Sequence, residues 1–326
     1  MKLCLNYPKM GENILIIKAG YSEFLEEEND SRKVSFGDVL RTTTLLHLYK
    51  KDFVTWVTDE QAFPLLKGNP YISRLLRFDW ITLEQLKKER FDVLINLEKV
   101  PGICAIADSI SAWKKYGFRF DSEKRKAEAY DKAFEVLAVS SDPKMKQLNK
   151  KSDQELLFEM VGAKWNGEEY ILNKPKMQEI YDIGLNTQIG TKWPTKKWPS
   201  PYWDILEEML IKNGFNVSRQ EKQEGVLEDI NKYMNWVDSC KMIVTGDTLG
   251  LHLAIAFKKK IIPLFGPTPY IEIPIYGRGK VILPEPIPEC MPCFSSFCKR
   301  GKNCMQEISP EMVYSEINKI FQQDKA

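Results

Sequence analysis

One stretch in the second half of the chain combines residue types that suit the binding of an anion such as phosphate. Residues 243–268 (IVTGDTLGLHLAIAFKKKIIPLFGPT) predict an apolar strand, an Asp-Thr turn, an apolar helix and a second apolar strand. The helix carries His252, one of only two histidines in the chain. Because the first N–H groups of a helix have no intrahelical partner and lie at the positive end of the helix dipole, this turn predicts an anion site.

The side chains around this turn have different expected roles. Asp247 is predicted to cap the helix, its carboxylate accepting from N–H groups of the first turn. Since a carboxylate repels phosphate, Asp247 suits a cap or a ribose hydroxyl better than a phosphate contact. Thr248 adds a hydroxyl, and His252, one turn into the helix, can reach the same anion. The alternative is a plain cap beside a locally satisfied histidine.

A basic loop provides a second group of candidates. Residues 183–203 (IGLNTQIGTKWPTKKWPSPYW) begin in a strand and reach Lys196 and Lys197 just before a Trp-Pro pair that suits the first turn of a helix. Open α/β sheets bind ligands in the loops that follow their strands, and a lysine there can neutralise a diphosphate. The alternative is a solvated loop whose tryptophans serve packing.

A carboxylate near the N-terminus is the candidate base. Residues 35–50 (SFGDVLRTTTLLHLYK) place a Gly-Asp pair at the start of a helix, after the first strand. Asp38 could take a proton from a substrate hydroxyl, or it could be a plain helix cap. His47 falls on the apolar side of that helix and is interpreted as structural.

A cluster of cysteines lies near the C-terminus. Its spacing, C-x₂-C-x₄-C-x₅-C, could close a tetrahedral zinc or iron site with a structural role, because four protein ligands leave no open position for catalysis. Reduced thiols in an irregular loop, or a disulfide, are the alternatives. The four residues are Cys290, Cys293, Cys298 and Cys304.

These residues need a framework of alternating strands and helices. Short apolar runs at 14–17, 53–57, 72–78 and 92–97 are separated by segments that could be helical, a pattern typical of βαβ units in a parallel sheet. After a lysine-rich middle the alternation restarts at 181–186. We therefore expect an α/β protein of two domains, 1–176 and 177–326, with a last helix at 310–323 that could pack on either domain.

Composition excludes several classes. The 326 residues are 43% hydrophobic and 28% charged, and 47 Lys and Arg nearly balance 45 Asp and Glu, so bulk charge does not indicate a nucleic-acid partner. The sequence has neither an apolar run of about 18 residues nor a signal peptide, which favours a cytoplasmic protein. Neither G-x-G-x-x-G nor G-x-x-x-x-G-K-[ST] occurs, which disfavours dinucleotide oxidoreductases and P-loop enzymes.

The order of the motifs resembles that of a known family. FGDVLRTTTLL, TKKWP, DTLGLHLAIAF, IIPLFGPT and CMPCF follow one another as in glycosyltransferase family 9, the ADP-heptose:lipopolysaccharide heptosyltransferases. The resemblance implies a GT-B fold, with two Rossmann-like βα domains facing a central cleft. The N-terminal domain would bind the acceptor and the C-terminal domain the nucleotide sugar.

The resemblance also assigns roles to residues. The family's catalytic aspartate corresponds to Asp38, and its phosphate-binding lysine to Lys196 with Lys197 adjacent. The donor-binding positions that it implies are Thr187, Lys196, Lys197, Asp247, Thr248, Leu249, Gly250 and His252.

The sequence departs from the family pattern in two places. The family has Gly directly after Asp-Thr, whereas this chain has Leu249 followed by Gly250, which bears on the fit of the donor. An acidic insertion, within residues 20–36, separates the first strand from the Gly-Asp pair and bears on the acceptor.

The implied reaction is an inverting transfer of heptose from ADP-heptose to a hydroxyl of a lipopolysaccharide core sugar or of a related glycan or protein. It needs no cofactor, since protein groups neutralise the diphosphate, and the glycolipid acceptor allows peripheral contact with the inner membrane face. Two rival classes stay open: a GT-B transferase or epimerase using another nucleotide sugar, and a non-catalytic nucleotide-sugar-binding protein. Product analysis with ADP-heptose against other nucleotide sugars tests the first class, whereas a non-catalytic binding protein would keep Lys196 and His252 but have no use for Asp38.

Overall fold

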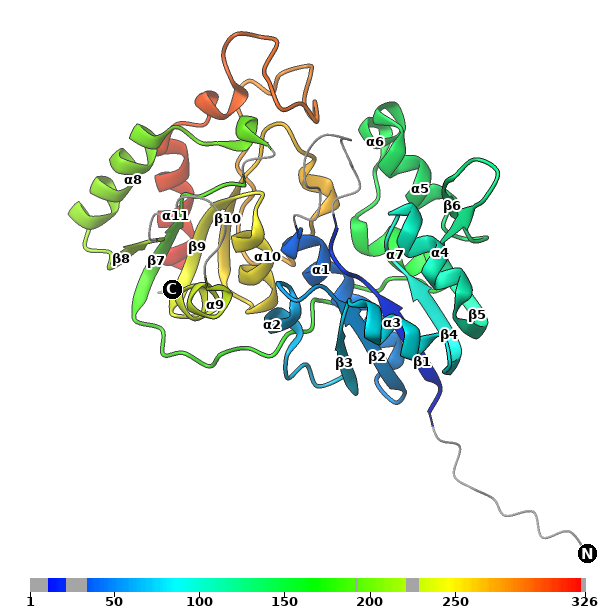
Figure 1. Ribbon diagram of the computed structural model, residues 1–326. Helices are drawn as coiled ribbons and strands as arrows, with labels where there is room; N and C mark the ends of the chain where they lie inside the picture. The colour runs from blue at the N-terminus through cyan, green and yellow to red at the C-terminus, as the bar shows by residue number, and fades with distance from the viewer. Residues whose placement is uncertain (1–10, 22–33, 191–192, 221–228, 324–326) are drawn as a thin grey trace, which may run out of the picture. The chain divides into compact units, whose positions relative to one another are not determined.

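The computed structural model describes residues 11–21, 34–190, 193–220 and 229–323 (Figure 1). The chain divides into two compact units. The N-terminal unit comprises the described residues up to Ala138 together with Gln154–Asn173, and the C-terminal unit comprises Val139–Asp153 together with the described residues from Lys174 onward. Each unit is an α/β sandwich, and each is described below by itself.

The N-terminal unit is built on a sheet in the order β3-β2-β1-β4-β5-β6. The four apolar runs predicted as strands in this half are all strands. Neighbours from β3 to β5 pair in parallel, and β6 returns antiparallel to β5, a hairpin that the sequence pattern did not predict. The strands are β1 (Asn13–Ile17), β2 (Phe53–Thr58), β3 (Arg74–Arg77), β4 (Arg90–Asn96), β5 (Ser111–Asp121) and β6 (Lys126–Ala129).

Helices follow β1, β2, β3 and β4, as expected for βαβ connections. Residues Ile14 to Ile17 of β1 are fully buried, because helices cover a parallel sheet on both faces and such a strand reads as a continuous apolar run. The helices are α1 (Phe36–Thr42), the 3₁₀ helix η1 (Thr43–Tyr49), α2 (Phe63–Leu66), α3 (Trp80–Leu86), α4 (Pro101–Ser109) and α7 (Asp153–Met160).

The C-terminal unit contains a parallel sheet in the order β10-β9-β7-β8. Its strands are β7 (Tyr181–Asn186), β8 (Val217–Arg219), β9 (Cys240–Gly246) and β10 (Lys260–Leu264). Its helices are α6 (Pro143–Leu148), the 3₁₀ helix η2 (Pro194–Lys196), α8 (Ser200–Lys212), α9 (Ile230–Asp238), α10 (Leu249–Ala256), η3 (Tyr270–Glu272), η4 (Cys304–Glu307) and α11 (Pro310–Gln323), with α5 (Phe134–Ser141) leading into it.

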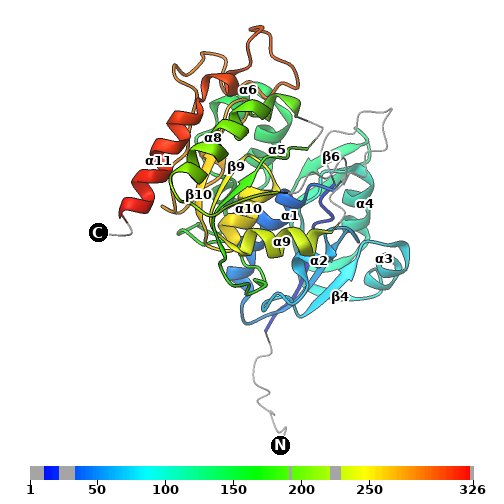
Figure 2. The ribbon, with the colours of Figure 1, turned by 90° about the vertical axis from the view of Figure 1, so that its left-hand side faces the viewer.

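Two segments, α11 and residues 139–153, belong to the C-terminal unit. The last helix, α11, packs on α8 and β10, with the rings of Phe215 and Phe321 5.0 Å apart, so it belongs to the C-terminal unit (Figure 2). Residues 139–153 group with the same unit, although the sequence pattern assigned them to the first domain. One contact that holds them there is the Lys146 ammonium, 4.6 Å from the centre of the Phe294 ring. No described helix has the length and apolar character to cross a bilayer.

Both sheets have a point at which the strand order reverses. In the N-terminal unit β1 lies between β2 and β4, and in the C-terminal unit β7 lies between β8 and β9. The helices that leave β1 and β4, or β7 and β9, lead away in opposite directions, so the carboxyl ends of these strands are where open α/β sheets bind ligands. The predicted site residues follow these strands in the chain.

The acidic insertion leaves and rejoins the fold at one place. Tyr21 and Val34 form an antiparallel bridge, and the Ser35 N–H donates to the Gly20 carbonyl at 2.7 Å. The chain therefore resumes at residue 34 beside the point where it departed, and Asp38 is reached as if the strand ran almost directly into the Gly-Asp pair. Residues 22–33 of the insertion lie outside the described residues.

Candidate active site

The turn between β9 and α10 is capped by a different residue from the one predicted. Thr248 is the N-cap, and its hydroxyl oxygen accepts from the Gly250 N–H at 3.2 Å. The prediction that Asp247 caps the helix is wrong. The reason is that the Asp247 carboxylate is held by Lys196, a partner 51 residues away in the sequence.

The Asp247 and Lys196 side chains form a largely buried ion pair. The Lys196 Nζ lies 2.6 Å from Asp247 Oδ2 and 3.3 Å from the Asp247 carbonyl oxygen, and the two side chains are 16% and 14% exposed. Burial raises the pKa of Asp247, but Lys196, with His252 and Thr268, outweighs burial and lowers it. Asp247 therefore stays ionised and orients the Lys196 ammonium. The ammonium has three N–H groups, one more than the two Asp247 oxygens that it contacts.

The structure brings together residues from three parts of the predicted motif. His252 is 6% exposed on α10 and acts electrostatically on Asp247. Thr268, at the end of the Gly-Pro-Thr stretch after β10, is also buried and lowers the pKa of Asp247. The Asp-Thr turn, the helical histidine and the Gly-Pro-Thr stretch thus meet around one carboxylate.

The other predicted donor residues are less enclosed. Lys197 is exposed, whereas Lys196 points to Asp247, so the structure distinguishes two lysines that the sequence treated together. Thr187 directly follows β7 and is half-buried, and Leu249, the first residue of α10, is also half-buried.

An asparagine that sequence reasoning missed holds this turn in place. Asn186, the last residue of β7, is 1% exposed. Its amide nitrogen donates to the hydroxyl oxygens of Thr245 at 2.7 Å and Thr248 at 2.9 Å, while the Tyr233 hydroxyl donates to its amide oxygen at 3.0 Å. Asn186 therefore joins the ends of β7 and β9 to α9. A polar residue ending an apolar strand run was the only sequence signal.

The glycine of the turn is required by this packing. A Cβ at Gly250 would collide with the Asn186 amide nitrogen and would lie 2.5 Å from the Tyr233 hydroxyl oxygen. The shift from Asp-Thr-Gly to Asp-Thr-Leu-Gly therefore leaves a glycine where α10 presses on Asn186. Leu249 takes the preceding position, which is half-buried.

The cysteine-rich loop is attached beside Lys196. The Thr195 hydroxyl donates to the Ser295 carbonyl at 2.5 Å, and the Asn303 amide donates to the Thr195 carbonyl at 2.9 Å. The Phe294 N–H donates to the Pro267 carbonyl at 2.9 Å. Hydrogen bonds thus fix this loop to both the lysine loop and the Gly-Pro-Thr stretch.

In the described residues the four cysteines are not arranged as the metal site that the spacing allowed. All four are free thiols: Cys290 and Cys293 are exposed, Cys298 is half-buried and Cys304 is buried. Within the described ranges, no group of three or more His, Cys, Asp or Glu side chains is placed to hold a metal ion. Cys304 instead packs at Gly266, where an added Cβ would lie 2.8 Å from its sulfur. Burial, with the charges of the other three thiols, raises the pKa of Cys304 to about 11.

The candidate base lies in the N-terminal unit. Asp38 is the third residue of α1, and Ser35 is the N-cap, so Asp38 is not the plain helix cap considered as an alternative. The Asp38 carboxylate is 3.0 Å from the Arg41 guanidinium one turn later, and its side chain is 32% exposed. A carboxylate so placed is held by α1 and can still reach a substrate.

The packing at Gly250 gives the first testable prediction. Gly250→Ala should force Asn186 and Tyr233 apart, displace the turn, and weaken binding of ADP, the nucleotide that the resemblance implies, by about tenfold or more. Gly102→Ala is the matched control, because Gly102 is also the second residue of a helix and has nothing within 4 Å of an added Cβ. Calorimetry measures both, and unchanged ADP affinity in Gly250→Ala would contradict this account.

The exposures of the cysteines predict an order of thiol reactivity. In the native protein Cys290 and Cys293 should react first with a thiol reagent, and Cys304 last, because a buried thiol of raised pKa forms little thiolate. Mass spectrometry of partly labelled protein gives the order, and unfolded protein is the control. Equal protection of all four thiols, together with about one equivalent of zinc or iron by elemental analysis, would instead support a metal-bound loop.

Comparison with known proteins identifies the family. The model of glycosyltransferase family 9 (heptosyltransferase) matches residues 81–303. Lipooligosaccharide heptosyltransferase 2 of Campylobacter jejuni is 29% identical over 25% of this chain and 26% of its own length. Lipopolysaccharide heptosyltransferase 1 of Pseudomonas aeruginosa is 32% identical over 33% of this chain and 36% of its own length. The chain thus spans about a quarter and about a third of these relatives.

Solved structures show the same fold over nearly the whole chain. A family 9 glycosyl transferase from Veillonella parvula has a TM-score of 0.65 at 16% identity and covers 96% of this chain and 98% of its own. E. coli heptosyltransferase WaaC with ADP-2-deoxy-2-fluoro heptose has a TM-score of 0.60 at 14% identity, covering 96% and 99%. The chain therefore has the GT-B fold of these structures, with two Rossmann-like units. Since the family model also matches well over half of the sequence, the chain belongs to glycosyltransferase family 9.

Proposed function

We propose that this protein is an inverting glycosyltransferase that moves a heptose from ADP-heptose to a hydroxyl of a lipopolysaccharide core sugar or of a related glycan or protein. The observation that carries the proposal is the Lys196–Asp247 pair at the start of α10, with His252 beside it, in a member of glycosyltransferase family 9. The heptose analogue in the WaaC structure supports this choice of donor.

The C-terminal unit would bind the leaving nucleotide. The N–H groups that begin α10 suit a diphosphate oxygen. Asp247 holds the Lys196 ammonium near the turn, where it can compensate charge that accumulates on ADP as the sugar departs. Asp247 also opposes phosphate by its own charge, so its expected role is to orient Lys196 and to accept from a hydroxyl.

The N-terminal unit would supply the base. The Asp38 carboxylate takes the proton of the acceptor hydroxyl while that oxygen attacks the anomeric carbon. The bond from this carbon to the diphosphate oxygen breaks with its electron pair, which leaves on ADP, and a single displacement inverts the configuration. Arg41, paired with Asp38 at 3.0 Å, holds the carboxylate on the surface of α1.

The same proposal includes location and acceptor. A cytoplasmic enzyme that modifies a growing glycolipid would meet its acceptor at the inner membrane face by peripheral contact. A screen of ADP-heptose against other nucleotide sugars, read by product analysis, tests the donor. Transfer from a different nucleotide sugar alone would replace ADP-heptose in the proposal and leave the reaction class unchanged.

The donor site predicts which changes weaken nucleotide binding. Lys196→Ala and His252→Ala should each weaken ADP binding by about tenfold or more, since a hydrogen bond to a charged group contributes about 1.5–3 kcal/mol. Lys197→Ala is the matched control, because its exposed side chain should matter less. Since Lys196→Ala strands a buried carboxylate, Lys196→Met with Asp247→Asn is measured as well. Calorimetry showing unchanged affinity in both single variants would remove the site from this turn.

The base predicts a separation of binding from turnover. Asp38→Asn should leave ADP-heptose affinity nearly unchanged and lower kcat by about 10²-fold or more, because an amide cannot accept the proton. Asp79→Asn is the control, since the Asp79 side chain caps α3 in the same unit by accepting from the Thr82 N–H at 2.8 Å. Steady-state kinetics decides: an Asp38→Asn enzyme as active as Asp79→Asn would make Asp38 structural.

A further inference from the structure

A buried ion pair in the N-terminal unit has no role in the reaction described so far. Lys18 follows β1 and Glu98 follows β4, the strands at which the sheet order reverses. The Lys18 Nζ lies 3.0 Å from Glu98 Oε1, and their side chains are 5% and 0% exposed. Burial raises the pKa of Glu98, and Lys18 opposes that rise. Desolvating two charges is costly and often adds no stability, so the pair calls for another explanation.

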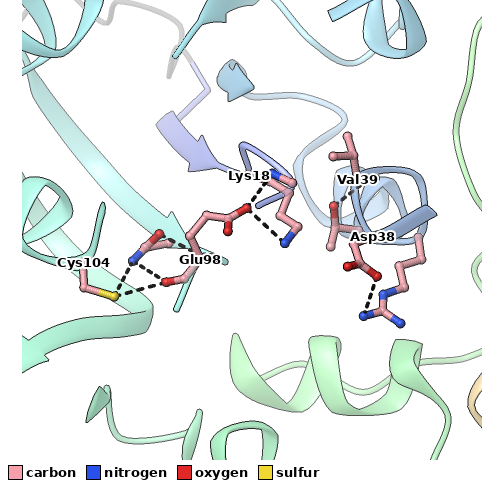
Figure 3. Close-up of polar contacts among 9 residues, drawn as sticks. Lys18, Asp38, Val39, Glu98 and Cys104 are labelled. Atoms are coloured by element: carbon pink, nitrogen blue, oxygen red, sulfur yellow. Dashed lines mark hydrogen bonds and ion pairs between the residues drawn. The ribbon is translucent and has the colours of Figure 1, made fainter. Parts of the chain in front are cut away.

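Glu98 is rigidly attached to the end of β4. The Asn96 amide nitrogen donates to the Glu98 carbonyl at 3.1 Å and to the Phe118 carbonyl at 2.7 Å. The Glu98 N–H donates to the Asn96 side-chain oxygen at 3.1 Å, and the Cys104 thiol donates to the Glu98 carbonyl at 3.2 Å (Figure 3). The backbone of Glu98 is therefore fixed on both its polar groups.

From Glu98 a chain of hydrogen bonds leads to the helix of the candidate base. The Gly20 N–H donates to Glu98 Oε1 at 2.7 Å, and the Ser35 N–H donates to the Gly20 carbonyl at 2.7 Å. The Val39 N–H donates to the carbonyl of Ser35, the N-cap of α1, at 3.3 Å (Figure 3). Three successive bonds thus connect the Glu98 carboxylate to the first turn of α1, which carries Asp38.

Close packing and charge connect the same groups. Gly20 has a φ of +92°, and a Cβ there would lie 2.7 Å from a methyl carbon of Val39, so the backbone at Gly20 presses directly on α1. Asp38 acts electrostatically on Glu98, and Figure 3 shows the Lys18 ammonium on the side of Glu98 that faces Asp38. The Glu98 carboxylate is therefore subject to both the Lys18 charge and the Asp38 charge.

We propose that Glu98 is a positioning residue for Asp38: through Gly20 and Ser35 it fixes the start of α1, and Lys18 makes its buried carboxylate tolerable. The inference rests on the proposed function, in which Asp38 is the base. It explains why a charged pair is retained at the end of β4, where an apolar pair would avoid the desolvation cost. It also explains how the Gly-Asp turn is held in place although an insertion precedes it.

The test compares two uncharged pairs of similar size. Lys18→Met with Glu98→Gln keeps an oxygen that can accept from the Gly20 N–H, whereas Lys18→Met with Glu98→Met removes it. Neither leaves a buried charge without its partner, so both should fold, which thermal unfolding checks. The readouts are kcat with ADP-heptose and a lipopolysaccharide core acceptor, the Kd for ADP, and amide hydrogen exchange at Gly20, Ser35 and Val39.

The Gln pair should keep kcat within about threefold of the starting protein, and the Met pair should lose about tenfold or more, because small displacements of a catalytic group are costly. The Kd for ADP should stay within about twofold in both. The three amides should exchange faster only in the Met pair. Equal kcat in the two double variants, or equal hydrogen exchange at the three amides, would overturn the proposal. The exchange comparison can be made without the lipopolysaccharide acceptor.

The same assay separates this inference from the function on which it rests. Asp38→Asn is measured beside the two pairs. If Asp38→Asn is inactive and the two double variants have equal kcat, the role of Glu98 alone is overturned. An Asp38→Asn enzyme with undiminished kcat overturns the role of Asp38 as base, and the role of Glu98 in turnover with it, whatever the pairs show.

Discussion

A buried asparagine at the carboxyl end of a parallel strand fixes the candidate site in each unit. Asn96 ends β4 and is fully buried, and Asn186 ends β7 and is 1% exposed. A buried amide must satisfy its donors and acceptor within the protein, since leaving one unpaired costs about 1–3 kcal/mol. Asn96 does so with the backbone of Glu98, and Asn186 with Thr245, Thr248 and Tyr233. Loops that would otherwise be free to move are thereby tied to the sheet.

Next to each asparagine stands a lysine–carboxylate pair, and the two pairs differ in exposure. The Lys18 and Glu98 side chains are 5% and 0% exposed, whereas the Lys196 and Asp247 side chains are 16% and 14% exposed. A fully buried pair cannot contact a ligand, so it can act only through the groups with which it forms hydrogen bonds. A partly exposed ammonium can approach a diphosphate. The same chemical pair is thus suited to positioning in one unit and to binding in the other.

The sequence predicted local features well and distant partners poorly. The strand at 14–17 and the helix at 310–323 were recognisable because apolar periodicity is a local property. The cap at Thr248 was missed because Asp247 is drawn away by Lys196, which no local pattern reveals. Glu98 was missed for the same reason: its partner Gly20 is 78 residues away. The β5–β6 hairpin lacks the apolar alternation that would mark it, since only Gly117 and Phe118 of β5 are buried.

The junction at Gly20 and Ser35 joins the two ends of the insertion next to α1, the helix that carries Asp38. Since the chain leaves at Tyr21 and returns at Val34 through one bridge, the length of the insertion does not alter the spacing that the fold sees between β1 and α1. A loop whose two ends are joined by a bridge can change in sequence at little cost to the elements that it connects. The Glu98 bond to Gly20 lies on the sheet side of that bridge. In the proposed mechanism, the position of Asp38 therefore depends on the bond to the Glu98 carboxylate after β4 rather than on the length of the insertion.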